Sequence, residues 1–242
     1  MQYIVDTHTH TLASGHAYST IREMAYSAAQ KGLKALAVTE HAPAMPGSCH
    51  EFYFFNMKVI PRKMCGIELL LGTEANIISL DGDLDLPKEA LEKLDIVIAS
   101  LHLPCCRIGT KEENTEAYLK IIENPMVDIV GHPDDARIPI ELEPVILAAK
   151  KHHKLIEINN SSLRTDGARK GAYENQLKIL ELCKKHHVMI ALGSDAHIEH
   201  DVGNHTLSDK VLEASGFPEE LVVNRSVELL KGYLHKFRNT PL

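Results

Sequence analysis

Residues 95–100 read Asp-Ile-Val-Ile-Ala-Ser, and this run indicates the class of fold. Its middle is continuously apolar, whereas a strand with one face in water alternates apolar and polar residues. Residues 155–158, Leu-Ile-Glu-Ile, form a second run of this kind. Such runs are typical of strands that are buried on both faces of a parallel sheet. The sequence therefore predicts a parallel sheet with helices packed against it.

Similar runs recur on both sides of these two, and each is followed by a helical pattern. The predicted strands are residues 3–6, 33–39, 68–73, 95–100, 128–131, 155–158 and 189–193. A capping box at Thr20 and Glu23 marks the start of the first helix. Segment 44–63 is aromatic and bounded by prolines without a clear period, so we predict a long loop there. Seven strand-helix units predict an α/β fold, either a closed barrel or an open doubly wound sheet, as a single domain over residues 1–242.

The composition excludes several classes of protein. Of the 242 residues, 44% are hydrophobic and 24% are charged, which is enough for one sizeable core. A net charge of -7 argues against long nucleic acids as partners, because backbone phosphates need clustered Lys and Arg. We see neither a secretory signal nor the roughly 18 apolar residues of a membrane span. Five cysteines without a Cys-x-x-Cys pair make a poor disulfide framework, so we expect a cytoplasmic protein with no membrane partner.

Six of the seven predicted strands end in a side chain that can bind a metal ion. The first ends in DTHTH (residues 6–10), where an extended chain points both imidazoles to the same face. The full set is His8, His10, His16, His41, Glu74, His102, His132, Asp195 and His197, of which His16 lies in the loop after the first strand. The carboxyl ends of parallel strands lie on one side of a sheet, so these groups should converge on one patch.

Seven imidazoles and two carboxylates exceed the needs of one ion, since a zinc ion takes about four ligands. Two or three divalent ions are therefore predicted. A set rich in imidazole favours zinc, iron or manganese over calcium or magnesium, which prefer oxygen ligands. The paired histidines at 152–153 and 186–187 instead follow lysines at predicted helix ends, where cationic groups complement the helix dipole.

The motifs together resemble those of the polymerase and histidinol phosphatase (PHP) family. The matching residues are DTHTH at 6–10, TEH at 39–41, GHP at 131–133 and SDAH at 194–197, with Glu74 and His102 between them. Over essentially the whole chain, the pattern is most similar to the small stand-alone YcdX-type phosphatases of this family. The resemblance implies a distorted TIM-like (β/α)7 barrel with the metal site at the carboxyl ends of the strands. Because phosphatases of this type form trimers, the resemblance also implies a homotrimer as the assembly to test.

The same resemblance implies how three ions would share the ligands. One ion would be held by His8, His10, Glu74 and Asp195, a second by Glu74, His102 and His132, and the third by His16, His41 and His197. All nine positions carry the expected type of residue. Glu74 would bridge two ions, and we expect Glu74, Asp195 and His197 to act in catalysis.

The predicted function is hydrolysis of small phosphate monoesters by a hydroxide that bridges two metal ions, with zinc as the expected metal and iron or manganese as alternatives. Uncatalysed monoester hydrolysis is extremely slow, so a site with several cations suits this reaction. Arg107 and Arg164 lie in loops after the fourth and sixth strands, and Asn159 follows the sixth. Each of these three side chains could contact the substrate or only stabilise the local backbone.

Three other functions compete with a monoesterase. A phosphodiesterase or exonuclease of the same family could use the same ligands, although the acidic net charge disfavours long nucleic acid. An amidohydrolase-type enzyme, which cleaves C–N bonds, also has a His-x-His motif in its first strand. Such enzymes commonly bridge their metals with a carbamylated lysine, however, and no lysine ends a predicted strand here. A regulatory protein that had lost activity should have lost ligands, and none of the nine is missing.

Overall fold

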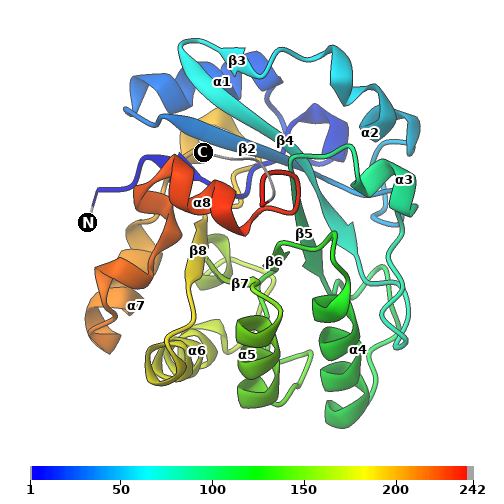
Figure 1. Cartoon of the computed structure of the whole chain (residues 1–242), viewed down its shortest axis with the longest axis vertical. Helices are drawn as coiled ribbons and strands as arrows, with labels where there is room; N and C mark the ends of the chain where they lie inside the picture. The colour runs from blue at the N-terminus through cyan, green and yellow to red at the C-terminus, as the bar shows by residue number, and fades with distance from the viewer. Residues whose placement is uncertain (1, 239–242) are drawn as a thin grey trace.

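The computed structural model describes residues 2–238 and contains a curved, mostly parallel sheet with helices around it (Figure 1). The strands are β1 (Val5–Asp6), β2 (Ala35–His41), β3 (Lys63–Met64), β4 (Ile67–Asn76), β5 (Ile96–Ser100), β6 (Ile129–Val130), β7 (Leu155–Asn159) and β8 (Ile190–Gly193). The α-helices are α1 (Ile21–Gln30), α2 (Phe52–Asn56), α3 (Lys88–Leu91), α4 (Lys111–Glu123), α5 (Leu142–Lys151), α6 (Ala172–His186), α7 (Thr206–Ser215) and α8 (Val227–Tyr233). Within residues 2–238, no helix has both the length and the apolar character needed to cross a bilayer.

The sheet contains all seven predicted strands. Its order is β1-β2-β4-β5-β6-β7-β8, and each neighbouring pair is parallel. β3 is an addition, since it pairs antiparallel with β4 by placing Lys63 opposite Glu68. The prediction of a loop over 44–63 is therefore wrong in part, because α2 and the start of β3 lie there. α2 has only 5 residues and no side-chain cap, so it leaves no helical period in the sequence.

The two edges of the sheet meet just beyond the ends of β1 and β8. Thr9 and Ala196 form a parallel bridge there. The backbone N–H of Asp195 donates to the carbonyl of His8 at 2.9 Å, and the N–H of His10 donates to the carbonyl of Ala196 at 2.9 Å. These contacts nearly close the sheet, which confirms the predicted distorted barrel. The segments that close it are the same segments that carry several predicted ligands.

The interior of the barrel changes from apolar to polar along each strand. Every second residue of a strand points to the same face. In β4, Leu70 belongs to the interior apolar cluster, and Glu74 follows four positions later. In β7, Leu155 belongs to the same cluster, and Glu157 follows two positions later. The carboxyl ends of the strands therefore place buried carboxylates above a hydrocarbon layer.

The C-terminal segment covers the amino ends of the strands. Leu230 of α8 and Val223 just before it belong to the same interior apolar cluster. The side-chain amide of Asn224 donates to the carbonyl of Val5 at 3.0 Å, and Lys231 pairs with Glu68 at the start of β4 at 2.7 Å. Figure 1 shows α8 in front of the strands. Because this end is sealed, the opposite end is the one available for a site.

Longer helices pack against the outer face of the sheet, where α4, α5 and α6 lie side by side (Figure 1). The predicted capping box of α1 is present, since Thr20 and Glu23 cap each other's backbone. A second capping box at Thr110 and Glu113 begins α4. The helices bury one face each, such as Val145 and Ile146 of α5, and thereby cover the outer side of the parallel strands.

Candidate metal centre

The structure gathers all nine predicted ligands at the carboxyl ends of the strands. They are His8, His10, His16, His41, Glu74, His102, His132, Asp195 and His197, and each has a ring or carboxylate contact with another member of the set. They come from β2, β4 and the segments just after β1, β5, β6 and β8. Seven of the nine are buried or nearly so, whereas His16 is exposed and His197 is partly exposed. The cluster is therefore recessed, with one side open to solvent.

Glu74 lies at the centre of this cluster. Its Oε1 lies 2.7 Å from Nε2 of His132 and 3.1 Å from Nε2 of His102. Its Oε2 lies 2.8 Å from Nδ1 of His41 and 3.3 Å from Nε2 of His8. The two oxygens thus face two different groups of imidazoles, which is the arrangement that a bridging carboxylate requires.

Asp195 faces the cluster from the other side. Its Oδ1 lies 3.2 Å from Nε2 of His10 and 3.6 Å from Nδ1 of His197. Its backbone φ is 55°, and that of His132 is 25°, both in the left-handed region that side chains other than glycine rarely adopt. Such backbone persists only where the surrounding structure holds it, and it clusters at functional sites.

The imidazoles nearest the solvent stack on one another. The ring of His16 lies 4.9 Å from that of His41 and 4.8 Å from that of His197, between ring centroids. Three ligand triplets have all their donor atoms within 4.8 Å of one another: His10, His41 and His197; His8, His10 and Glu74; and His41, Glu74 and His102. His10, His41 and Glu74 each belong to two triplets, so the groups adjoin one another.

The chemistry of these groups fits divalent cations. Nδ1 of His41, Oε2 of Glu74 and Nε2 of His102 are buried yet make no hydrogen bond within residues 2–238. Burial lowers the pKa of His102 to about 4. Burial raises the pKa of Glu74, but the facing His102 and His8 outweigh that effect and hold it well below its usual value. A neutral His102 beside an ionised Glu74 is the combination of protonation states that metal ligation needs, whereas burial of His8 is outweighed by Glu157 and Glu74, which raise its pKa.

Polar side chains behind the ligands hold the imidazoles in place. Oε1 of Glu157 lies 2.6 Å from Nδ1 of His8. Oγ of Ser14 lies 3.1 Å from Nδ1 of His10, and Oδ1 of Asn76 lies 2.8 Å from Nδ1 of His102. Each contact occupies one ring nitrogen and leaves the other directed at the cluster, as is common for metal-binding histidines.

Sequence reasoning missed Glu157, which lies in the one strand that was predicted to lack a ligand. Its Oε2 also accepts a hydrogen bond from the backbone N–H of His132 at 2.8 Å. A carboxylate within an apolar strand was the available signal, because a buried charge requires partners. The strand without a ligand therefore supplies the group that orients one.

The predicted arginines lie at the rim. The side chain of Arg107 is 73% exposed and lies 3.8 Å from Glu113. Arg164 pairs with Asp166 at 3.1 Å and with Asp201 at 3.5 Å. Within residues 2–238, both arginines thus pair with acidic side chains that are not among the nine predicted ligands.

A different arginine reaches the cluster. Nη1 of Arg169 donates to Oδ2 of Asp195 at 3.2 Å and to Oγ of Ser162 at 3.2 Å, and its side chain is 16% exposed. The predicted Asn159 also contacts Asp195, since its Nδ2 donates to Oδ2 at 3.2 Å. Arg169 lies five positions beyond Arg164, and the sequence offers no local signal that distinguishes the two.

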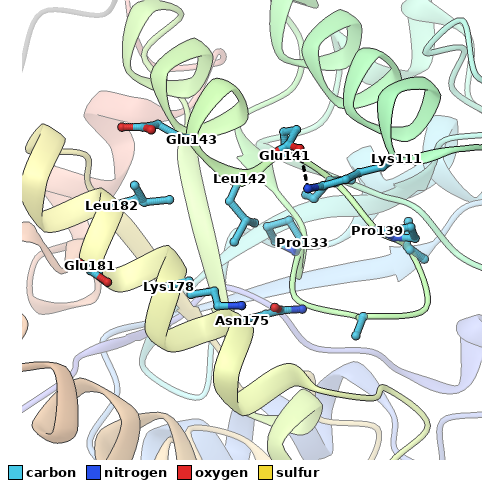
Figure 2. A pocket seen from close by; sticks show the side chains of 13 residues that line it. Lys111, Pro133, Pro139, Glu141, Leu142, Glu143, Asn175, Lys178, Glu181 and Leu182 are labelled. Atoms are coloured by element: carbon cyan, nitrogen blue, oxygen red, sulfur yellow. Dashed lines mark ion pairs between the residues drawn. The ribbon is translucent and has the colours of Figure 1, made fainter.

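Two cavities flank the ligands. One of about 320 Å³ is lined by His102 and Arg169, and the other of about 280 Å³ is lined by Asp195 and Arg164. A larger cavity of about 530 Å³ lies among α4, α5 and α6, where Figure 2 shows the ion pair between Lys111 and Glu141. None of the nine predicted ligands lines this larger cavity, so its size does not make it the reaction site.

A parallel barrel that carries clustered histidines and carboxylates at the carboxyl ends of its strands defines a metal-site hydrolase scaffold. The model of the PHP domain family matches residues 6–192. The chain belongs to the PHP domain family.

Known proteins agree with this assignment. A "Probable phosphatase" of Clostridium novyi (strain NT) is 49% identical over 234 residues, covering 97% of this chain and 95% of the relative. A "Probable phosphatase" of Caldicellulosiruptor bescii is 47% identical over 230 residues, covering 95% of each chain. The predicted family and the predicted phosphatase class are confirmed by the family match and these relatives.

A solved structure shares the fold. It is histidinol phosphate phosphatase from Lactococcus lactis subsp. lactis Il1403, complexed with zinc, L-histidinol and phosphate. The TM-score is 0.61 at 21% sequence identity, and the match covers 89% of this chain and 95% of that chain. At this identity the likeness concerns the fold, and it agrees with the distorted barrel.

Proposed function

We propose that the chain hydrolyses small phosphate monoesters at a site for three divalent ions held by the nine predicted ligands. One observation carries this proposal: Glu74 lies between two groups of imidazoles, with one oxygen 2.7 Å from His132 and the other 2.8 Å from His41. The imidazole-rich donor set favours zinc, with iron or manganese as alternatives. Bound divalent ions would supply Lewis acidity and an activated water nucleophile near neutral pH.

The residues of the chain have distinct parts in this proposal. Glu74, Asp195 and His197 hold the reacting end of the site, while Glu157 fixes the ring of His8 from behind at 2.6 Å. Arg169 is the cation that reaches the ligand cluster, and its planar guanidinium can bind two phosphoryl oxygens at once.

Asn159 at the end of β7 and two loop arginines complete the substrate contacts. Asn159 lies beside Asp195 and can donate to the ester, whereas Arg107 and Arg164 on the rim would meet only the parts of a substrate that extend outward. We expect Arg169→Ala to reduce kcat/KM more than Arg107→Ala does, because Arg169 is 16% exposed and Arg107 is 73% exposed.

The cavities support a small substrate. Volumes of about 320 Å³ and about 280 Å³ lie close to the lower limit of the range for small-molecule sites. A net charge of -7 also disfavours long nucleic acids. In this proposal residues 1–242 form a single domain. Whether three such chains form a homotrimer is tested by measuring the mass of the native protein in solution.

The experiment measures metal content and two activities in one preparation. Protein reconstituted with zinc, manganese or iron is analysed for metal per chain and assayed with p-nitrophenyl phosphate and its bis-ester, with and without a chelator. We expect two to three ions per chain and chelator-sensitive cleavage of the monoester. Preference for the bis-ester would replace the proposal with a phosphodiesterase. Failure to bind stoichiometric metal would overturn it.

A further inference from the structure

The two cavities that flank the ligands differ in the chemistry of their walls. The cavity beside Asp195 is lined by charged and polar groups, including Arg164, Asp166 and Asp201. The cavity beside His102 has hydrocarbon on its walls, from Leu103, Pro104, Ile138 and Ala168. The first cavity also has Leu163 and Leu207 on its walls, but the second cavity has more hydrocarbon and therefore offers the larger apolar surface to a group attached to the reacting phosphate.

The two arginines of this second cavity already have partners within the chain. Arg137 donates to Asp135 through Nε at 3.0 Å and through Nη2 at 2.5 Å. Arg169 donates to Asp195 and Ser162, each at 3.2 Å. What the cavity still offers to a ligand is mainly its hydrocarbon wall and the edge where Arg169 meets the cluster.

Leu103 is the largest exposed side chain of that wall, in which Pro104 and Ala168 are also exposed. It lies one position after the predicted ligand His102 and is 41% exposed, whereas the neighbouring Leu101 is 1% exposed and part of the core. The exposed part of this leucine is not buried within the chain, so its burial against a ligand remains available. A group bound there would have its phosphate end at His102 and Arg169.

We infer that this cavity binds the leaving group of the ester and that this leaving group is a hydrocarbon or a single aromatic ring on a short linker. The inference rests on the proposed function and assigns the substrate class. A volume of about 320 Å³ suits one ring with its linker. Leu103, Pro104 and Ile138 would pack against the ring, while Arg169 holds the phosphoryl group.

The test compares two esters of primary alcohols, 3-phenylpropyl phosphate and glycerol 3-phosphate, with the zinc-reconstituted protein. Both leave as alkoxides of similar basicity, so their difference reports binding of the leaving group. We expect kcat/KM to favour 3-phenylpropyl phosphate by at least about 10-fold, since even one buried methylene discriminates by about 10-fold or more. Leu103→Ser should reduce this ratio by about 10-fold.

Ile198→Ser is the matched control. Ile198 is 38% exposed in the loop after β8 and lines neither flanking cavity among the described residues. It should leave the ratio of the two kcat/KM values unchanged. Equal ratios in the wild type and Leu103→Ser would overturn the inference, and a ratio that responds to Arg164→Ala instead would assign the leaving group to the polar cavity.

A binding measurement separates this inference from the proposed function. 3-Phenylpropylphosphonate cannot be hydrolysed at its P–C bond, and its affinity can be compared with that of methylphosphonate by calorimetry. Tighter binding of the phenylpropyl compound that is lost in Leu103→Ser supports the inference even where neither ester is turned over. Absence of turnover with that binding intact would refute the phosphatase proposal alone, and equal affinities would refute the inference.

Discussion

Two buried carboxylates at opposite ends of the barrel, Glu74 and Asp128, have very different surroundings. Asp128 is fully buried, and its Oδ1 accepts from the backbone N–H of His235 at 2.6 Å and from Arg238 at 3.3 Å. Its Oδ2 accepts from the backbone N–H of Val97 at 3.0 Å. Glu74 is 1% exposed, but its Oε2 makes no hydrogen bond within the described chain.

The difference distinguishes a structural carboxylate from a candidate metal ligand. A buried charge is costly unless the protein pairs it and satisfies its hydrogen bonds. The chain itself supplies those partners to Asp128, and they tie the C-terminal segment to the sheet. Around Glu74 the chain supplies imidazoles whose nitrogens converge on a shared space, which suits cations better than protons. Four predictions test this contrast.

The largest effect is expected for Glu74→Gln, which keeps the size of the side chain and removes its charge. We expect loss of at least one metal ion per chain and at least about 100-fold lower kcat/KM, since disturbing only the partner of a ligand already costs about 10- to 100-fold. Elemental analysis and a monoester assay measure both. If Glu74→Gln kept its full metal content and full activity, Glu74 would not be a metal ligand.

Asp128→Ala should act on stability instead. It leaves Arg238 and the backbone N–H groups of Val97 and His235 without their acceptor, and such a change costs about 3–5 kcal/mol. Urea unfolding of the metal-loaded protein measures the loss. Metal content and kcat/KM of the folded fraction should match the wild type, and loss of metal from folded Asp128→Ala would show that the two ends are coupled.

Gly193→Ala should moderately reduce both the stability of the protein and its affinity for metal. A Cβ at this position would lie 2.2 Å from Oε1 of Glu157 and 2.7 Å from Cβ of His8. Overpacking of this kind costs about 1–3 kcal/mol, and displacing Glu157 should weaken metal affinity by about 10- to 100-fold. Unfolding and metal titration measure the two effects.

Gly232→Ala is the control for that substitution. Gly232 lies in α8, and a Cβ there would meet no atom within 4 Å. Alanine should be neutral or stabilise the helix by up to about 1 kcal/mol. If Gly193→Ala and Gly232→Ala had the same stability and the same metal affinity, the close approach of Glu157 and His8 to Gly193 would not be required for either property.

The smallest effect concerns Lys154 at the sealed end. Its ammonium donates to the carbonyls of Asn124 at 2.9 Å and Val127 at 2.5 Å, and burial lowers the pKa of Lys154 to about 8. Below pH 8 the lysine is protonated in both the folded and the unfolded state. Between pH 8 and about 10.4 the unfolded state binds more protons, so stability rises with pH, by about 1–2 kcal/mol.

Urea unfolding at pH 7.5 to 10 measures that rise. Lys154→Met should abolish this part of it and leave the pH profile of hydrolysis unchanged, because Lys154 lies at the end away from the ligands. The same slope in both proteins would show that the lysine titrates alike in the folded and unfolded states.

The sequence was sufficient for much of the fold and for the nine candidate ligands. Apolar runs such as 95–100 predict buried strands, and six of the nine candidate ligands follow such a run by a residue or two, where a parallel strand ends. β3 and α2 were not predicted, because a strand of 2 residues and a helix of 5 residues are too short to leave a period.

What the sequence by itself determined is the direction of each side chain relative to its own strand, since alternation is a local property of the backbone. The tertiary structure alone decided which groups meet across strands. Glu157 contacts His8 across 149 positions, and Arg169 rather than Arg164 reaches Asp195. Such contacts depend on strand register and on the near closure of the barrel, and these arise only when distant segments pack together.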